Sequence, residues 1–357
     1  MILKSIELKN FRNYEDLDLK FDSGTNILFG DNAQGKTNIL EAAYVSGTTK
    51  SHKGSRDKDM IRFGEDESHI RTIVEKQGKE YQLDIHLKKN RSKGIAINKV
   101  PIKKASELFG ILNMVFFSPE DLNIIKNGPS ERRRFLDAEI CQLDKIYLSD
   151  LLMQRNRLLK DMQHQPQLME TLPVWDMQLV EYGKRLIRRR RQFVEELSEI
   201  VTGIHRNISG KREELVLRYE PNIDAEFLED ELNRVREKDR KYAQTSVGPH
   251  RDDISFFIRG VDIRKFGSQG QQRTSALSLK LSEIELVRQT IHDTPVLLLD
   301  DVLSELDSNR QNYLLNSIHD IQTMITCTGL DEFVRNRFQI DKVFHVIDGH
   351  VSETTEM

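Results

Sequence analysis

The sequence predicts an α/β fold in which both ends of the chain contribute strands to one sheet, with a β-rich subdomain and a helical arm between them. An apolar strand at 26–29 runs directly into a glycine-rich loop and a helix. A second, fully apolar strand at 296–299 follows an amphipathic helix near the other end of the chain. Between them, residues 130–209 have the apolar spacing of long helices, so the arm is expected to be an insertion.

The composition indicates a soluble and highly charged globular protein. Of the 357 residues, 38% are hydrophobic and 31% are charged, which argues against a disordered or membrane-embedded chain. No apolar run approaches the ~18 residues of a membrane span, and the N-terminus lacks the apolar stretch of a signal peptide, so a cytoplasmic location is expected. Cys141 and Cys327 are far apart and are expected to be reduced packing residues.

The first part of the chain is expected to form mainly strands. Two short strands are predicted at 2–8 and 17–21. Residues 70–97 alternate apolar and polar side chains around turn signals at Gln77-Gly78 and Lys89-Asn90, which predicts the β-rich subdomain.

The helical arm is expected to contain two antiparallel helices. Pro166 and Pro173 interrupt the helical spacing, so the connection is placed near 163–173. At 1.5 Å per residue, a helix of ~30 residues would be roughly 45 Å long. After the arm, a strand pair at 254–263, a polar loop and a helix at 275–289 lead to the strand at 296–299.

One loop has the pattern that binds nucleotide phosphates. The segment 30–37 fits G-x-x-x-x-G-K-[ST], in which backbone N–H groups surround the phosphates, Lys36 reaches the β and γ oxygens, and the Thr37 hydroxyl ligates Mg²⁺. A strand precedes the loop and a helical stretch follows at 38–44, which disfavours a chance glycine turn. The loop, which we call the P-loop, predicts ATP binding by Gly30, Asp31, Asn32, Ala33, Gln34, Gly35, Lys36 and Thr37.

The presence of the P-loop favours a functional interpretation of two further segments. Asp300 and Asp301 end an apolar strand, where they suit a magnesium ion and an attacking water, although alone they fit an ordinary solvated loop equally well. The polar segment 267–274 precedes a helix. Ser268 and the N–H groups around Gly270 could therefore bind an anion, or the segment could simply cap the helix.

The order of these parts resembles the ATP-binding-cassette heads of the SMC class of DNA-maintenance ATPases. The P-loop is followed by a Ser-x-Gly-Gln loop, the carboxylate strand and Ser304-Glu305-Leu306-Asp307. Blocks spread over nearly the whole chain are similar to the RecF family of bacterial recombination mediators, and membrane transporters lack them. These blocks are Phe11-Arg12-Asn13-Tyr14, Phe117-Ser118-Pro119-Glu120-Asp121-Leu122, Arg132-Arg133-Arg134-Phe135-Leu136-Asp137 and Gly248-Pro249-His250-Arg251-Asp252-Asp253.

The resemblance implies three parts of the chain. An N-terminal part of the ATPase head, with the P-loop and the β subdomain, is expected at 1–129. The helical arm, or lobe II, is expected at 130–210, and the C-terminal part of the head at 211–357.

The resemblance also implies that each ATP lies between the P-loop of one subunit and the Ser-x-Gly-Gln loop of another, so that ATP drives dimerisation. Ser268, Gly270 and Gln271 would then reach the partner's γ-phosphate. On the same resemblance, Asp300 would bind the metal together with Thr37, and Asp301 would orient the attacking water. Asp307 would lie at the dimer contact, and Arg12 would approach the nucleotide.

Several positions depart from the cassette pattern and predict slow hydrolysis. Gln269 replaces a glycine, Asp301 replaces a longer Glu, and no Gln occurs between 111 and 130. The strand expected at 323–327 ends in Thr328 instead of a His. We expect an ATPase that acts as a timer, with a kcat well under the ~10 s⁻¹ typical of enzymes.

The net charge of −3 does not itself point to nucleic acid, but basic residues are clustered. Each cluster alone is more often a solvated helix face than a DNA contact. Sequence-independent contact with duplex phosphates is predicted, with strong salt dependence. The candidate residues are Lys53, Arg56, Arg132, Arg133, Arg188, Arg189, Arg190 and Arg191.

The resemblance implies DNA repair, replication restart and the SOS response, with binding at single-strand gaps and with RecR, RecO and RecA as partners. Two other classes stay open. A DNA-strand motor or nuclease-associated P-loop ATPase would need helicase motifs, which we do not find in the sequence. A transporter ATPase subunit is disfavoured by the arginine-rich insertion.

Overall fold

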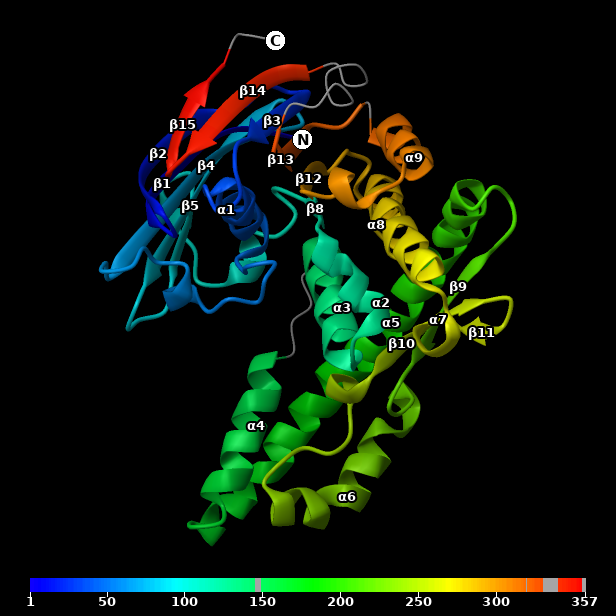
Figure 1. Cartoon of the computed structure of the whole chain (residues 1–357). Helices are drawn as coiled ribbons and strands as arrows, with labels where there is room; N and C mark the ends of the chain where they lie inside the picture. The colour runs from blue at the N-terminus through cyan, green and yellow to red at the C-terminus, as the bar shows by residue number, and fades with distance from the viewer. Residues whose placement is uncertain (145–148, 319, 330–339, 355–357) are drawn as a thin grey trace. The chain divides into compact units, whose positions relative to one another are not determined.

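The computed structural model describes residues 1–144, 149–318, 320–329 and 340–354 (Figure 1). The chain divides into two compact units, Met1–Asp121 with Leu277–Met357, and Leu122–Ala276. Both ends of the chain therefore fold into the first unit, as the strand pattern predicted. The expected boundaries near residues 129 and 210 stay a prediction, because this division separates units by contacts only.

The central sheet of the first unit has the order β15-β14-β3-β13-β12-β8. All neighbours are parallel except β14 and β15. Residues 296–300 are buried throughout, as expected for a strand covered on both faces. The strands are β3 Thr25–Phe29, β8 Met114–Phe117, β12 Val296–Asp300, β13 Thr323–Cys327, β14 Ile340–Ile347 and β15 His350–Glu353.

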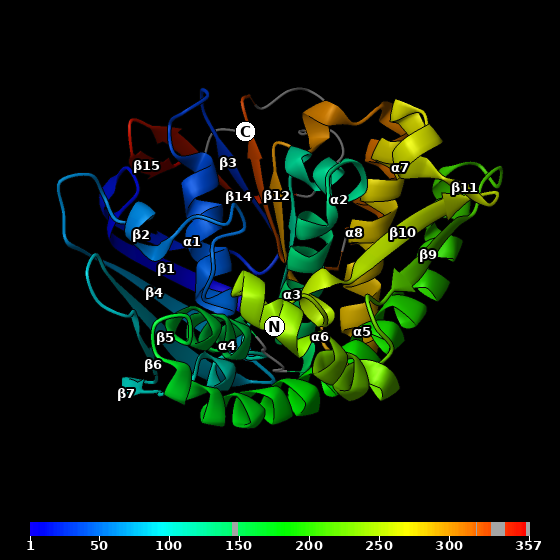
Figure 2. The same ribbon diagram turned by 90° about the horizontal axis from the view of Figure 1, so that it is seen from below.

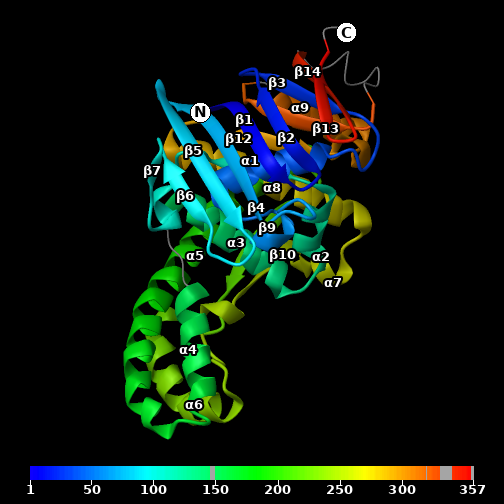
Figure 3. The same cartoon turned by 90° about the vertical axis from the view of Figure 1, so that its left-hand side faces the viewer.

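A second, antiparallel sheet in the same unit has the order β2-β1-β4-β5-β6-β7 (Figure 3). Its members are β1 Ile2–Phe11, β2 Tyr14–Lys20, β4 Glu67–Lys76, β5 Lys79–Lys88, β6 Gly94–Ile97 and β7 Val100–Pro101. The β-rich subdomain is confirmed, and the first two strands join it. The β1–β2 turn is tighter than predicted, because Arg12 adopts a positive φ of 54° there.

One hydrophobic core joins the two sheets through helix α1 Lys36–Thr48. Leu3 and Ile70 come from the antiparallel sheet, and Leu298 comes from the central sheet. Leu40 belongs to α1, which packs against strands of both sheets. The P-loop is therefore held at the end of a central strand and at the start of a buried helix.

The second unit holds the arm and a small sheet, β11-β10-β9 (Figure 2). Within the stretch 129–208, where two helices were predicted, the described residues form three helices, and residues 145–148 lie outside the description. Pro173 opens the last helix instead of ending one, since the first turn tolerates a missing N–H. The elements are α2 Leu122–Lys126, α3 Pro129–Asp144, α4 Ser149–Asp161, α5 Leu172–Ile208, β9 Leu215–Glu220, α6 Leu228–Tyr242, β10 Asp253–Ile258, β11 Val261–Asp262 and α7 Ile263–Phe266.

Helix α8 Gln269–Ile291 begins six residues before the predicted start at 275. The reason is a reciprocal cap: the Gln271 N–H donates to Ser268 Oγ at 3.2 Å, and the Ser268 N–H donates to Gln271 Oε1 at 2.9 Å. The Ser-x-Gly-Gln loop is thus the cap and first turn of a helix. The last helix described, α9 Ser308–Ile318, follows β12.

The structure also bears on the two cysteines and on the expected absence of a membrane span. Cys327 is a half-buried thiol, whereas the side chain of Cys141 lies outside the described part of the structure. Among the described helices, none combines the length and apolar character that a bilayer span requires.

Candidate nucleotide-binding site

Glycines shape the P-loop at two positions where a side chain does not fit. Gly30 and Gly35 have φ values of +148° and +110°, in the region that favours glycine. A Cβ on Gly30 would lie 2.2 Å from the carbonyl oxygen of Val346, and one on Gly35 would lie 2.5 Å from Asn13 Nδ2. Both the backbone conformation and the neighbouring atoms therefore require glycine at these two positions of the loop.

The N-terminus of α1 is suited to an anion. Its N-cap, Gly35, supplies no side-chain hydrogen bond, and the first turn contains no acidic residue. The first N–H groups of a helix lack partners within the helix, and they carry the positive end of its dipole. Phosphate oxygens match both properties.

The ammonium of Lys36 lies within the P-loop. Its Nζ donates to the carbonyl oxygens of Gly30 and Asp31, both at 2.6 Å. Burial lowers the pKa of Lys36, and nearby groups led by Asp301 oppose this shift. A positive charge with only carbonyl partners inside a loop is placed to receive phosphate oxygens.

Thr37 and Asp300 bring a hydroxyl and a carboxylate together at the start of α1, two of the oxygen ligands that a hard cation such as Mg²⁺ prefers. The Thr37 hydroxyl donates to Asp300 Oδ1 at 2.8 Å, and the Thr326 hydroxyl donates to the same oxygen at 2.8 Å. The described residues contain no cluster of three or more His, Cys, Asp or Glu that would hold a metal alone. One hydroxyl and one carboxylate fit Mg²⁺, which usually completes its shell with phosphate oxygens and waters.

Asp301 is held in an unusual backbone conformation beside Asp300. Its φ is +53°, and its N–H donates to Thr326 Oγ1 at 3.0 Å. The Ser304 hydroxyl donates to the carbonyl oxygen of Asp301 at 2.8 Å and to its Oδ1 at 3.2 Å. Thr326 therefore holds the carboxylate of Asp300 and the backbone of Asp301, a role that sequence reasoning missed although parallel neighbouring strands end at one edge.

Residues that sequence reasoning did not assign also hold the P-loop from outside. Asn13 Nδ2 donates to the Gln34 carbonyl at 3.2 Å, and Asn38 Nδ2 donates to Asn13 Oδ1 at 2.8 Å. The Asp348 N–H donates to Gln34 Oε1 at 2.5 Å. The Gln34 side chain thus binds the β14–β15 turn, and only its backbone remains available for phosphate.

Arg12 is bound to a buried carboxylate. Its Nε and Nη2 donate to the two oxygens of Glu41, both at 2.7 Å, and its Nη1 donates to the Asp59 carbonyl at 2.6 Å. Burial alone would raise the pKa of Glu41, but hydrogen bonds from Arg12 and Ser51 hold it below its usual range. The guanidinium therefore serves the fold around α1, and we leave Arg12 out of the proposed nucleotide contacts.

The Ser-x-Gly-Gln loop of the second unit exposes Ser268, Gln269 and Gly270 to solvent. The Gln271 side chain is instead turned back, because its Nε2 donates to Glu213 Oε1 at 2.8 Å. Asp307 accepts from the N–H groups of Asn309 at 3.1 Å and Arg310 at 3.0 Å, so it caps α9 while staying half exposed.

The basic candidates divide into buried and exposed residues. Arg132 is 1% exposed and pairs with Asp253 at 2.5 Å. Arg190 is 2% exposed and pairs with Asp252 at 3.0 Å and Asp137 at 2.5 Å. These two arginines are occupied within the second unit, so the structure counts against their predicted contact with DNA.

The remaining basic candidates have different surroundings. Arg188, Arg189 and Arg191 form ion pairs with glutamates and an aspartate on or near the surface, and Arg133 donates to the Asp252 carbonyl at 2.9 Å. Lys53 and Arg56 are exposed in the loop after α1.

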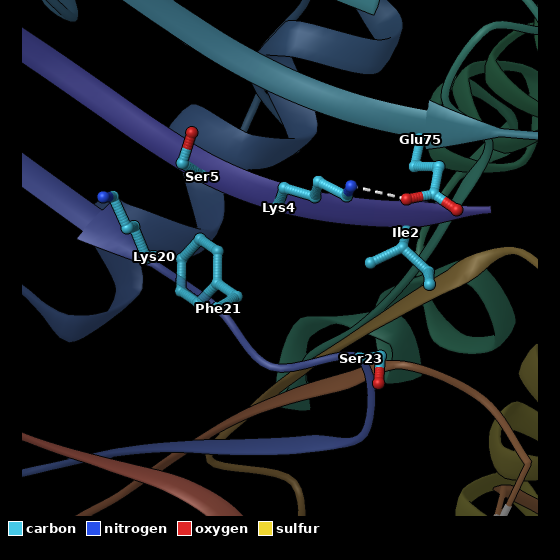
Figure 4. Close-up of a pocket in the computed structure, with 7 residues that line it drawn as sticks. All are labelled: Ile2, Lys4, Ser5, Lys20, Phe21, Ser23 and Glu75. Carbon is cyan, nitrogen blue, oxygen red and sulfur yellow. Dashed lines mark ion pairs between the residues drawn. The ribbon is translucent and has the colours of Figure 1, made fainter. Parts of the chain in front are cut away.

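A pocket of about 490 Å³ lies away from the P-loop residues (Figure 4). Its lining comes from β1, β2, β4 and the turn after β2, and Lys4 pairs with Glu75 across it at 2.6 Å. Because none of the P-loop residues, Asp300 or Asp301 lines it, we do not assign nucleotide binding to this pocket.

Comparisons with known proteins agree with this arrangement. A family model described as the RecF/RecN/SMC N terminal domain matches residues 2–352. A DNA replication and repair protein RecF from Agathobacter rectalis is 72% identical, with both chains covered to 100%. Its counterpart from Lachnospira eligens is 62% identical over 98% of this chain and 99% of its own.

Solved structures give the same grouping. The recombination mediator protein RecF-ATP in the RecFOR pathway has a TM-score of 0.90 at 37% identity, with 99% of this chain and 97% of that chain covered. An Smc head bound to the C-winged helix domain of ScpA has a TM-score of 0.58 at 16% identity over 99% and 97%, a likeness of fold alone. The chain belongs to the RecF family of DNA replication and repair proteins, within the RecF/RecN/SMC group.

Proposed function

We propose that this chain is an ATP-dependent DNA-binding mediator of recombinational repair and replication restart. The observation that carries the proposal is the P-loop, where glycine backbone, the uncapped start of α1 and the Lys36 ammonium form one phosphate site. The solved relative that is 37% identical over nearly the whole chain is described as RecF-ATP, which supports ATP as the nucleotide.

Each group in the site has a proposed role. Lys36 exchanges its two carbonyl partners for β and γ oxygens, and Thr37 with Asp300 ligates Mg²⁺. The ion would neutralise charge on the phosphates. Asp301 orients the attacking water. Its side chain is shorter than that of Glu, which supports slow hydrolysis.

The second half of the ATP site is proposed to come from another copy of the chain. Ser268 and Gly270 are exposed at the start of α8, and the start of a helix is a place where anions bind. In this arrangement ATP joins two subunits, Asp307 lies at their contact, and hydrolysis separates them. Gln271 is bound to Glu213 and holds the loop through its hydrogen bond with Ser268.

Duplex DNA is the proposed cargo of the ATP-bound dimer. Lys53 and Arg56 are exposed and lie in the same loop of the first unit, which suits contacts with phosphates. Gap recognition, with RecR, RecO and RecA as partners in the cytoplasm, is part of the proposal. Its support is family membership and the RecFOR pathway named for the solved relative.

Light scattering with and without ATP, in the presence and absence of duplex DNA, tests the proposal. Wild-type protein is expected to double its mass with ATP and to bind DNA as the dimer. Lys36→Arg removes the compact ammonium from the loop, so it is expected to stay monomeric at the same ATP concentration. An unchanged mass of the wild type with ATP would show that the dimer model is wrong.

A further inference from the structure

Gln271 connects two parts of the second unit through opposite ends of one amide. On one side, Oε1 accepts from the Ser268 N–H at 2.9 Å and completes the cap of α8. On the other side, Nε2 donates to Glu213 Oε1 at 2.8 Å. Glu213 lies in the turn between α5 and β9, and its other oxygen is 3.9 Å from the buried His205 ring near the end of α5.

The carboxylate decides which way the amide points. An ionised Glu only accepts hydrogen bonds, so it selects the amide orientation that presents Nε2 to it. That orientation leaves Oε1 to accept from the Ser268 N–H. In a flipped amide, Nε2 would face the Ser268 N–H, and two donors would oppose each other. Glu213 thereby selects the form of Gln271 that closes the cap.

The closed cap also determines what the Ser268 hydroxyl can do. Its oxygen accepts from the Gln271 N–H at 3.2 Å, so its own proton remains to be donated outward from an exposed position. A phosphate oxygen is an acceptor of the kind that such a hydroxyl binds.

We propose that Glu213 is a positioning residue for the ATP site completed by a second subunit. By fixing Gln271, it holds Ser268 in the geometry that donates to the partner's phosphate. The inference rests on the proposed function. It links the turn after the arm helix α5 to the nucleotide through Glu213, a side chain that makes no contact with ATP.

A set of variants at these two positions tests the proposal. Glu213→Ala is expected to raise the ATP concentration needed for dimers by about tenfold, the usual effect of losing a hydrogen bond to a charged group. Gln271→Glu places two carboxylates together and is expected to lose dimers more severely. The double variant Gln271→Glu with Glu213→Gln restores a donor facing a carboxylate, so it is expected to recover most of the dimer.

Three measurements separate positioning from a general folding defect. ATP binding to the monomer, followed by a fluorescent analogue, and the midpoint of thermal unfolding are expected to stay within about twofold and a few degrees of the wild type. Glu214→Ala, at the adjacent exposed glutamate that pairs with Arg206 at 3.7 Å, is the matched control and is expected to dimerise normally.

Mixing gives the decisive readout. Glu213→Ala keeps a sound P-loop, and Lys36→Arg keeps a sound Ser268 loop, so their mixed dimer contains one intact site. The mixture is expected to form more dimer than either variant alone. If it forms no more, or if Glu213→Ala dimerises like Glu214→Ala, the positioning role is wrong. If the wild type itself does not dimerise with ATP, the proposed function fails first.

Discussion

Four successive arginines at 188–191 show how differently neighbouring residues of one helix can behave. Successive positions on a helix point about 100° apart, so only one of the four faces the interior fully. Arg190 is buried against Asp252 and Asp137, whereas Arg188 pairs at the surface with Glu226 at 2.8 Å. The sequence shows the four charges but not their partners, since Asp252 lies 62 positions away.

Replacing Arg190 with Met is expected to destabilise the protein by about 3–5 kcal/mol, because Asp252 would be left as an uncompensated buried charge. Arg191→Met is the matched control, and its cost is expected to stay below about 1 kcal/mol, since its ion pair with Asp224 is at the surface. Urea unfolding of the two variants measures the difference. Equal losses would mean that the buried pairs of Arg190 contribute no more than a surface pair.

The Arg12–Glu41 pair is expected to make stability depend on pH. The folded pKa of Glu41 is lowered, so its contribution is present above the unfolded value of about 4.5 and is lost as the pH falls through the folded value. Wild type is therefore expected to exceed Glu41→Gln by about 1–3 kcal/mol at pH 7 and to approach it in acid. Urea unfolding between pH 3 and 7 checks this, and a gap that does not narrow below about pH 4.5 would contradict it.

At the scale of elements, α5 is a single helix of 37 residues that carries two glycines with different surroundings. A Cβ on Gly203 would meet nothing within 4 Å, whereas one on Gly183 would lie 2.7 Å from Leu228 Cδ2. Glycine weakens a helix because it loses more conformational freedom on folding than alanine does. The two positions therefore separate helix propensity from packing.

Gly203→Ala is expected to stabilise the protein by about 0.5–1 kcal/mol through helix propensity alone. Gly183→Ala gains the same propensity, but Leu228 must move, so its net effect is expected to be smaller or negative. Thermal unfolding of both variants tests this pair. A larger gain for Gly183→Ala would show that the space around Leu228 is looser than the structure indicates.

At the scale of the whole molecule, the proposed DNA contacts belong to the ATP-bound dimer. Replacing both Lys53 and Arg56 with Ala is expected to weaken duplex binding uniformly across sequences and to reduce the salt slope by about 2, since each neutralised phosphate contributes ~0.9. Lys103→Ala, at an exposed lysine of the same unit, is the charge-matched control for one of them. Fluorescence anisotropy at several salt concentrations with ATP measures the slope, and an unchanged slope would exclude these two residues.

Much of the architecture was predictable because local patterns carry it. The P-loop is a contiguous pattern with a strand before it and a helix after it, and the strand at 296–300 is continuously apolar because both of its faces are covered. Helix boundaries were less predictable, since the start of α8 depends on the cap between Ser268 and Gln271 and the start of α5 depends on Pro173.

The sequence by itself determined the α/β class, the P-loop, the carboxylates at the end of β12 and the family, because each is written in neighbouring residues or in their order. The tertiary structure decided which polar groups meet: Thr326 with Asp300, Arg12 with Glu41, Gln271 with Glu213 and Arg190 with Asp252. These pairs join residues 26 to 62 positions apart, so burial and hydrogen bonding select each partner, and no local pattern records it.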